Sequence, residues 1–424
     1  MDSRSEPTDV PEEPVNAPQE PASMSEEPMN APRESETVRE EPAVGPEEFL
    51  MEPGEAEGLV NVVVEKRTTA GGGRLASLDA LRGFDMFWIV GGYWIALGLG
   101  KGLDNPWFNR HILPQVRHME WEGFTAWDLI MPLFLFVVGA AMPFSFGKRL
   151  EQGQGKVRLA IHILFRVIVL WVFGMIAQGR LLTYDLSQFR FYSNTLQAIA
   201  AGYLISSILL LGLRLRGQLI VTTVLLLAYW GLLMLRPLTP EENLAIYIDK
   251  LILGPYQDGT TYTWILSSMT FAATVMIGAF AGQLLRSDLG KLRKTLFLFA
   301  AGIACVYVGW AWGLIFPIIK HIWTSSMVLY AGGWSLILLG AFYLIIDVLR
   351  LRFLGYFFIV IGMNAIAVYM VTRVFDFRGL GDILVRGLAQ WTGEWQDFTR
   401  AVAGFVILWL ILHYMYRKKT FIKI

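Results

Sequence analysis

The sequence predicts an all-α protein that crosses a membrane about ten times. Of its 424 residues, 54% are hydrophobic and only 17% are charged, whereas soluble domains carry about 25% charged residues. The apolar residues gather into runs close to the ~20 residues that span ~30 Å of hydrocarbon. These runs lack the ten-residue alternation of a membrane β-barrel. We therefore expect a polytopic membrane protein built from α-helices.

The first 73 residues are predicted to form a separate, disordered tail rich in proline and glutamate. They hold 18 acidic and 5 basic residues, whereas residues 74–424 hold 18 acidic and 31 basic ones. A 14-residue repeat begins at Glu12, Glu26 and Glu40 with EEPVNAP, EEPMNAP and EEPAVGP. Such a composition cannot bury enough apolar surface to offset the entropy of ordering. We expect two regions, the acidic tail (1–73) and a transmembrane domain (74–424).

Ten apolar segments within the second region are expected to be membrane-spanning helices. They cover approximately residues 81–99, 129–146, 159–177, 195–213, 218–235, 265–285, 295–316, 326–346, 354–374 and 401–416.

The distribution of basic residues between the loops predicts the orientation of the chain. The loops on the side of the N-terminus, together with the C-terminal tail, hold 16 Lys and Arg in 39 residues. The opposite loops hold 11 in 108 residues. Because cytoplasmic loops carry an excess of Lys and Arg, both termini are predicted to be cytoplasmic. We expect an integral protein of the plasma (inner) membrane, with residues 101–128 on its outer face.

Residues 118–139, HMEWEGFTAWDLIMPLFLFVVG, are the strongest candidate for a functional site. His118 and Asp128 stand just before an apolar span, where ionisable groups are costly and often functional. An imidazole can act as an acid, a base or an acyl carrier. A bent loop would let Asp128 orient the ring, although a lone loop histidine can also be structural.

Other polar residues near the spans have both a functional and a structural interpretation. Trp121 could stack on a sugar ring, and Gln197 and Asn364 could bind a hydroxyl or a carbonyl or simply bond across helices. Arg166 lies within the third span, where it either faces a cavity or extends its charge to the membrane surface. Arg82 is three residues after Asp79, so it could contact a phosphate or only form an ion pair.

Several classes of function are not supported. The sequence has no Walker motif, no GxGxxG after a strand, no HExxH and no GxSxG. Its single cysteine, Cys305, excludes a disulfide framework and a thiolate metal site. We expect no metal cofactor and no nucleic-acid partner.

Five motifs in the same order resemble the heparan-α-glucosaminide N-acetyltransferase family, which belongs to the transmembrane acyltransferases. They are SLDALRG from Ser77, the H-x-x-W-x-G-x-x-x-x-D run from His118, LQAIAAGY from Leu196, IGMNAIAVY from Ile361 and YRKKTFIKI from Tyr416. The resemblance extends over about residues 74–424.

The resemblance implies an enzyme that acetylates an amino sugar or other glycan outside with acetyl-CoA from the cytoplasm. His118 falls on the family's catalytic histidine, and Asp128 on the acid that follows it. The cofactor-binding candidates are basic residues at the cytoplasmic side: Arg82, Lys148, Arg149 and Arg166. The acceptor-binding candidates are Trp121, Glu122, Gln197 and Asn364. The implied partners are acetyl-CoA as co-substrate, a carbohydrate acceptor and the lipid bilayer; a homodimer stays open.

Some alternatives remain open at this point. Glu122 stands where the family carries asparagine, and Ala198 where it often carries arginine, so the acceptor and the choice between N- and O-transfer are undecided. His118 could act as a base or carry the acetyl group itself. The alternatives to an enzyme are a transporter or channel for a small solute and a relative that only binds CoA.

Overall fold

The described part of the protein is entirely helical. The computed structural model describes residues 75–178 and 188–422. Within these ranges the one β contact is an isolated antiparallel bridge between Glu122 and Ile319. The predicted all-helical fold is therefore confirmed for this part of the chain. The predicted tail, residues 1–73, lies outside the described residues, so the division into two regions stays a prediction.

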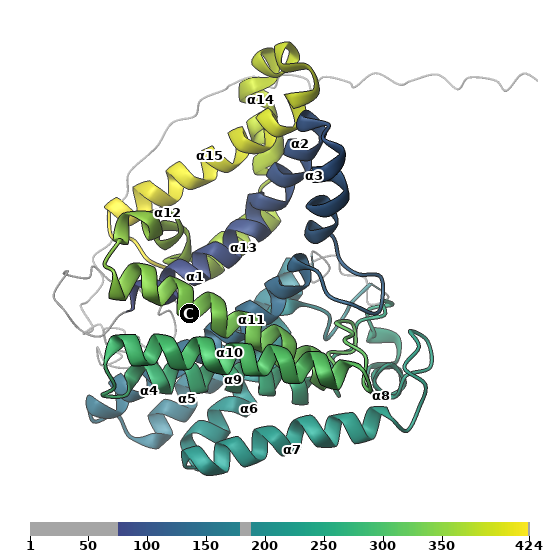
Figure 1. Cartoon of the computed structure of the whole chain (residues 1–424), viewed down its shortest axis with the longest axis vertical. Coiled ribbons are helices and arrows are strands. Elements are labelled where there is room, and N and C mark those ends of the chain that lie inside the picture. Colours follow the sequence, from purple (N-terminus) through teal and green to yellow (C-terminus); the bar gives the residue numbers. More distant parts are fainter. Residues whose placement is uncertain (1–74, 179–187, 423–424) are drawn as a thin grey trace, which may run out of the picture. The chain divides into compact units, whose positions relative to one another are not determined.

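The helices follow one another along the chain, and Figure 1 labels most of them. The N-terminal part contains α1 (Ala76–Phe87), a π-helical turn (Trp88–Gly92), α2 (Tyr93–Leu103), α3 (Pro106–His111), two 3-10 helices (Leu113–Val116 and Ala126–Leu129) and α4 (Ile130–Glu151). The middle contains α5 (Lys156–Ala177), α6 (Thr195–Gly212), α7 (Leu215–Leu233), α8 (Leu244–Leu253), a 3-10 turn (Gly254–Tyr256), α9 (Ser268–Arg286) and α10 (Lys291–Gly313). The C-terminal part contains α11 (Ser325–Tyr343), a π-helical turn (Leu344–Val348), α12 (Arg352–Gly362), α13 (Ala365–Val374), α14 (Phe377–Ala389), a 3-10 helix (Gln390–Trp395) and α15 (Gln396–Arg417).

The described residues contain nine helices that are long and apolar enough to cross a membrane. A tenth is reached when α12 and α13, which meet at an angle of 54°, are counted as one broken span. Each of the ten predicted segments coincides with one of these. The chain therefore has the helices of an integral membrane protein, whereas the cytoplasmic position of both termini stays a prediction.

Three segments predicted as outer loops are partly helical. They contain α3, α8 and α14, which are short and carry charged or polar residues. Because these helices lack a long apolar run, hydropathy alone does not distinguish them from loops. In α14, leucine and isoleucine side chains lie on an exposed face, and Ile383 is 68% exposed.

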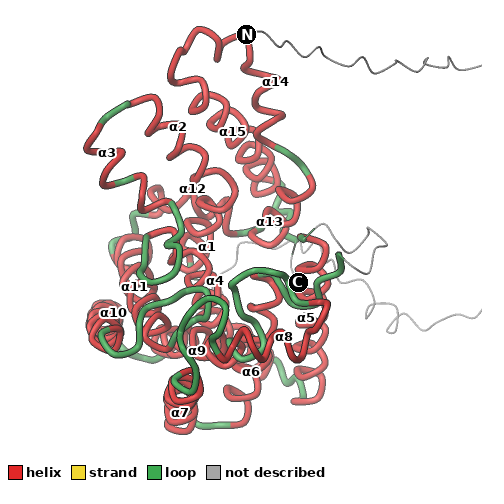
Figure 2. The backbone as a smooth tube through the Cα atoms, turned by 90° about the vertical axis from the view of Figure 1, so that its right-hand side faces the viewer, coloured by secondary structure: helices red, strands yellow, loops and turns green. Residues whose placement is uncertain are grey.

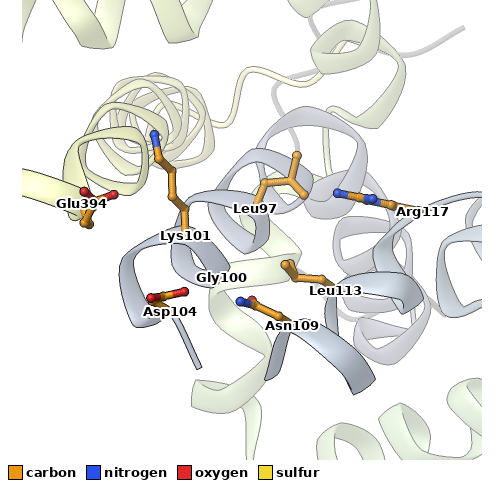
Figure 3. A pocket seen from close by; sticks show the side chains of 8 residues that line it. All are labelled: Leu97, Gly100, Lys101, Asp104, Asn109, Leu113, Arg117 and Glu394. Atoms are coloured by element: carbon orange, nitrogen blue, oxygen red, sulfur yellow. The ribbon is translucent and has the colours of Figure 1, made fainter. Parts of the chain in front are cut away.

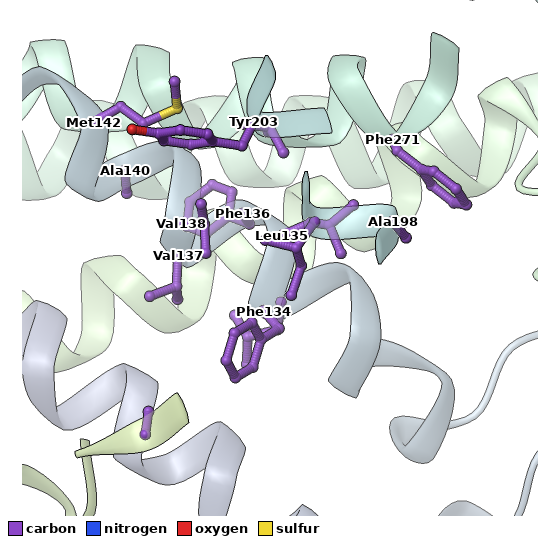
Figure 4. Close-up of a cluster of buried hydrophobic side chains, with 14 of the residues drawn as sticks. Phe134, Leu135, Phe136, Val137, Val138, Ala140, Met142, Ala198, Tyr203 and Phe271 are labelled. Atoms are coloured by element: carbon purple, nitrogen blue, oxygen red, sulfur yellow. The ribbon is translucent and has the colours of Figure 1, made fainter. Parts of the chain in front are cut away.

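The helices from α4 to α11 pack around a common core. This core lies between α4 and α9, the two most buried of the candidate spans. Phe136 from α4, Tyr203 from α6 and Phe271 from α9 fill the space between these helices (Figure 4). A Cβ added at Gly278 would lie only 2.0 Å from the carbonyl oxygen of Phe136. The backbones of α4 and α9 therefore touch, as is usual where small residues line a helix interface in a membrane.

The spans at the two ends of the described chain, which precede α4 or follow α11, pack mainly on one another. α1 packs along α12, and α15 packs on both α2 and α14. The loops that follow α3 and α8 appear in green in Figure 2, and the first of these leads back to the start of α4. This returning loop carries His118.

Candidate functional site

His118 and Asp128 meet in the loop that leads into α4. Nδ1 of His118 lies 2.7 Å from Oδ1 of Asp128. The second carboxylate oxygen accepts hydrogen bonds from the backbone N–H of Met119 at 3.3 Å and from that of Thr125 at 3.2 Å. The Thr125 hydroxyl donates to the same oxygen at 3.0 Å. Asp128 thus forms a capping box with Thr125 and closes the loop around the histidine.

The exposure of the two side chains indicates which ring nitrogen can react. The His118 side chain is 46% exposed, whereas that of Asp128 is 1% exposed. Because Nδ1 faces the buried carboxylate, Nε2 is the nitrogen left for a reacting molecule. An imidazole held in this way can take a proton or an acyl group at Nε2.

A third ionisable residue, Lys320, belongs to this cluster and was missed in the sequence. Its Nζ lies 3.1 Å from Nδ1 of His118 and 3.3 Å from Oδ1 of Asp128. The Lys320 side chain is only 7% exposed. The signal that could have revealed it is a single lysine inside the apolar run IIKHIW, residues 318–323.

The loop that carries Lys320 is joined directly to the loop that carries His118. The backbone N–H of Gly123 donates to the carbonyl oxygen of Ile318 at 2.9 Å. Glu122 and Ile319 form the isolated β bridge next to it. These backbone contacts hold two segments together that lie almost 200 residues apart in the sequence. In this bridge Glu122 takes part through its backbone, and its side chain is exposed.

Burial changes the protonation of the residues around His118. It lowers the pKa of Lys320 to about 8, although the Asp128 carboxylate acts in the opposite direction. Burial and then the charge of Lys320 lower the pKa of His321 to about 4. His321 is therefore neutral at neutral pH. Lys320 is still charged there, but its pKa lies only slightly above neutral pH.

One half-buried aromatic ring lies beside His118, and a second packs against the first. The ring of Trp127 lies 6.2 Å from that of His118, and Tyr93 of α2 lies 4.9 Å from Trp127. The sequence pattern favoured Trp121 as the ring that stacks on a sugar. The indole N–H of Trp121 donates to the carbonyl oxygen of Leu238 at 2.9 Å. That hydrogen bond fixes the Trp121 ring, whereas Trp127 faces His118.

A cavity of about 620 Å³ opens one helical turn along α2 from Tyr93 (Figure 3). It is lined by Leu97, Gly100, Lys101, Asp104, Asn109, Leu113, Arg117 and Glu394. Its walls thus carry two leucines, an amide and charges of both signs. Arg117 immediately precedes His118 in the chain, so the cavity and the His118 cluster share one segment. A cavity with such walls is suited to a polar small molecule.

Gln197 and Asn364 are both bonded to the backbone of neighbouring segments. The Gln197 side chain donates to the carbonyl oxygen of Phe191 at 2.7 Å and is fully buried. The Asn364 side chain donates to the carbonyl oxygen of Thr420 at 3.3 Å. It also accepts a hydrogen bond from the backbone N–H of Ile422 at 2.9 Å. Gln197 thus fixes the loop before α6, and Asn364 fixes the segment after α15.

A cationic group lies at the other end of α4. Nη2 of Arg149 lies 2.9 Å from Nε2 of His162 in α5. The Arg166 guanidinium lies 4.7 Å from the centre of the Tyr203 ring. Its Nε has no hydrogen-bond partner among the described residues. Arg158 and Arg166 are both close enough to Arg149 to repel it electrostatically, so this group favours an anion.

The remaining cofactor candidates occupy different positions. Arg82 forms an ion pair with Asp79 in α1, with an N–O distance of 3.4 Å. Lys148 is exposed near the end of α4. Of the two roles considered for Arg82, the structure shows the ion pair with Asp79. Arg149 and Arg166, in contrast, lie in one group.

The two groups are separated by the length of one helix. Asp128 lies two residues before the first residue of α4, and Arg149 lies two residues before its last. A helix of 22 residues is about 33 Å long at 1.5 Å per residue. This is close to the ~30 Å thickness of a bilayer core. The His118 cluster and the cationic group therefore lie at opposite ends of a single membrane span.

The sequence was also compared with known proteins. Residues 74–281 match a family model described as a domain of unknown function, DUF5009. The human heparan-alpha-glucosaminide N-acetyltransferase is 25% identical in an alignment that covers 83% of this chain and 60% of the human protein. The mouse protein of the same name is 29% identical over 103 residues, which cover 24% of this chain and 14% of the mouse protein. This chain thus spans about 60% of the length of its human relative.

The human alignment extends over most of the chain and agrees with the resemblance expected from the five sequence motifs. In sequence, the chain is therefore similar to the heparan-alpha-glucosaminide N-acetyltransferases over most of its length.

Proposed function

We propose that this protein is a membrane acyltransferase that moves an acetyl group from cytoplasmic acetyl-CoA to an amino sugar or other glycan on the outer side. The observation that carries the proposal is the contact of 2.7 Å between Nδ1 of His118 and the buried Asp128, in a side chain that is 46% exposed. Nε2 is then the ring nitrogen left for a reacting molecule. Two relatives are named as N-acetyltransferases. An N-acetyltransferase needs a group that accepts a proton or the acyl group itself.

The cationic group at the opposite end of α4 supports a two-sided reaction. Acetyl-CoA is a large anion and cannot cross the hydrocarbon of the membrane. Arg149 and Arg166 would bind its phosphates, because guanidinium groups form strong, charge-assisted hydrogen bonds with phosphate oxygens. The acyl end would then extend into the helix bundle toward His118.

The outer cavity would receive the acceptor. Aromatic rings beside polar groups are suited to a sugar, whose faces are apolar and whose edges are polar. Trp127 and Tyr93 supply the rings, and the cavity that begins at Leu97 supplies the polar groups. Arg117 and Lys101 would face anionic substituents of the acceptor, while Glu394 and Asp104 would face a cationic amine; all four line the cavity. The acceptor would therefore approach His118 from the side of α2.

The decisive experiment is acetyl transfer by the purified full chain with radiolabelled acetyl-CoA and a panel of amino and neutral sugars. We expect transfer by the wild type and a loss of turnover of about 10²–10⁴-fold in His118→Ala, the usual contribution of general acid–base catalysis. His111→Ala is the matched control, because His111 is an exposed histidine of α3 in the same outer region. It should retain wild-type turnover.

The outcomes separate the alternatives. A folded His118→Ala protein that transfers acetyl groups at nearly the wild-type rate would contradict the role of His118. Binding of acetyl-CoA without transfer to any sugar would indicate a relative that only binds CoA.

A transporter for a small solute is the second candidate, because the span formed by α12 and α13 is broken at 54°. Broken helices of this kind line the binding sites of many transporters. Here the break is occupied by the segment after α15, through the hydrogen bonds of Asn364. Uptake of a labelled sugar into vesicles without acetylation would favour this function over the enzyme.

A further inference from the structure

Nδ1 of His118 has two polar neighbours of opposite charge. The carboxylate of Asp128 lies at 2.7 Å and the amine of Lys320 at 3.1 Å. A ring nitrogen either carries a proton and donates or carries a lone pair and accepts. It cannot donate to the carboxylate and accept from an ammonium at the same time. The two neighbours therefore match two different protonation states of one nitrogen.

Lys320 lies in this position at a considerable cost. Its side chain is 7% exposed, and desolvation of an ammonium group is unfavourable. Asp128 offsets part of this cost, because Oδ1 of the carboxylate lies 3.3 Å from Nζ. The other carboxylate oxygen is already engaged by Met119 and Thr125. Oδ1 is thus shared by Lys320 and His118, and the two buried residues form one polar cluster with the partly exposed ring of His118.

We propose that Lys320 is a positioning residue that holds Nδ1 of His118 when this nitrogen carries no proton, as Asp128 holds it when it does. The ring would then keep one orientation while protons move between its two nitrogens. The role in catalysis rests on the proposed acyl transfer, but the hydrogen bonding itself does not depend on it.

The role of Lys320 is the same in both routes that the sequence leaves open. If His118 carries the acetyl group, Nε2 forms the new C–N bond while the C–S bond of acetyl-CoA breaks. The thiolate then takes up the proton that leaves Nδ1, and CoA departs as the thiol. If His118 is a base, Nε2 takes the proton of the acceptor while the acceptor bonds to the acetyl carbon and the C–S bond breaks. The imidazolium then loses its Nδ1 proton to the thiolate, and CoA again departs as the thiol. In either case a neutral ring with a substituent or proton on Nε2 has a lone pair on Nδ1, to which the Lys320 ammonium donates.

The groups facing Lys320 allow both of its charge states to form. Asp128 and His118 contact it directly, and the neighbouring His321 is neutral above about pH 4. The Tyr262 hydroxyl has its pKa raised to about 12 by burial and then by the charge of Asp128, so it stays neutral. Burial holds the pKa of Lys320 near 8. The ammonium should therefore be lost within an accessible pH range.

The test uses the full chain with ¹⁵N-labelled histidine and reads the tautomer of His118 from its ring ¹⁵N shifts. His118→Ala identifies the signal among the five histidines. In Lys320→Met, we expect the tautomer with the proton on Nδ1 to gain at least several-fold over the wild type, because only Asp128 remains. The matched control is Lys294→Met, which removes another buried lysine whose amine donates to the carbonyl oxygen of Leu285 at 2.8 Å. It should leave the His118 signal unchanged.

A second measurement needs no variant and covers the case in which Lys320→Met does not fold. In the wild type, the tautomer with the proton on Nδ1 should gain as the pH rises from 7 to 9.5, because Lys320 loses its charge. A tautomer ratio that is the same in Lys320→Met as in the wild type, or constant across this pH range, would overturn the proposal. These outcomes are independent of acetyl transfer, so they are distinct from a failure of the proposed function.

If the protein transfers acetyl groups as proposed, the positioning role of Lys320 also predicts how its variants change kcat and KM. Lys320→Met should lower kcat about tenfold or more and leave the KM for acetyl-CoA within about twofold, because the cofactor phosphates would bind a membrane's width away. Lys320→Arg, which keeps a charged donor, should recover part of kcat. A change confined to KM would contradict the positioning role.

Discussion

At the scale of single residues, the environment of each histidine separates a candidate for chemistry from a packing residue. His118 and His321 both lie near Lys320, yet only His118 contacts the buried carboxylate of Asp128. His321 instead packs its ring 4.2 Å from that of Tyr262 and lies 3.1 Å from the Thr261 hydroxyl. His321 is therefore better interpreted as a packing residue than as a candidate for chemistry.

His321 gives a prediction for pH dependence. Its pKa in the folded protein is lowered to about 4, against about 6.5 in an unfolded chain. The folded state thus binds fewer protons between these values, and the stability contributed above pH 6.5 is lost as the pH falls toward 4. In His321→Phe, the fall in Tm between pH 7.5 and pH 5 should be smaller than in the wild type.

The same variant separates the two histidines by activity. His321→Phe should keep turnover within roughly tenfold of the wild type, about 1.4 kcal/mol in barrier height, whereas His118→Ala should not. A loss in His321→Phe as large as that in His118→Ala would place His321 in the chemistry.

At the scale of elements, the sequence predicts what lies within a span better than what joins two spans. The ten apolar runs are visible as local composition. Lys320 and His118 meet only because residues 318–319 pair with residues 122–123, and such a contact between distant segments leaves no local pattern. Trp127 was overlooked for the same reason, because its contact with Tyr93 requires α2 to lie beside the start of α4.

The break between α12 and α13 yields a prediction about Asn364. Asn364→Ala should lower the free energy of unfolding by about 1–3 kcal/mol, because the carbonyl of Thr420 and the N–H of Ile422 lose a buried partner. Removing the residues after Arg417 should lower stability as well, and the two changes should be less than additive because they break the same contacts. Asn105→Ala, at the exposed start of α3, is the control for loss of an asparagine, and each Tm is measured in detergent.

Acetyl-transfer kinetics distinguish this structural role from acceptor binding. An Asn364→Ala protein of unchanged Tm and raised KM for the sugar would return Asn364 to the acceptor site, as the sequence had suggested.

At the scale of the whole molecule, the proposed function depends on which side of the membrane each end of α4 faces. The His118 cluster lies at its first residues and the cationic group at its last. The distribution of Lys and Arg, 16 in 39 loop residues against 11 in 108, predicts that the cationic end faces the cytoplasm. Acetyl-CoA and the acceptor would then meet the protein from opposite compartments.

Labelling of single cysteines tests this orientation directly. In a Cys305→Ala background, Glu120→Cys and Gln152→Cys place one thiol beyond each end of α4, at positions whose side chains are exposed. A maleimide that cannot cross membranes should label Glu120→Cys in intact cells and Gln152→Cys only after permeabilisation, because the charged reagent has no path through ~30 Å of hydrocarbon. Neither change removes a Lys or Arg, so the charge asymmetry that sets the orientation is kept, and Cys305→Ala alone measures background labelling. The reverse pattern would place the arginines outside and His118 in the cytoplasm, where acetyl-CoA and the acceptor could no longer approach as proposed.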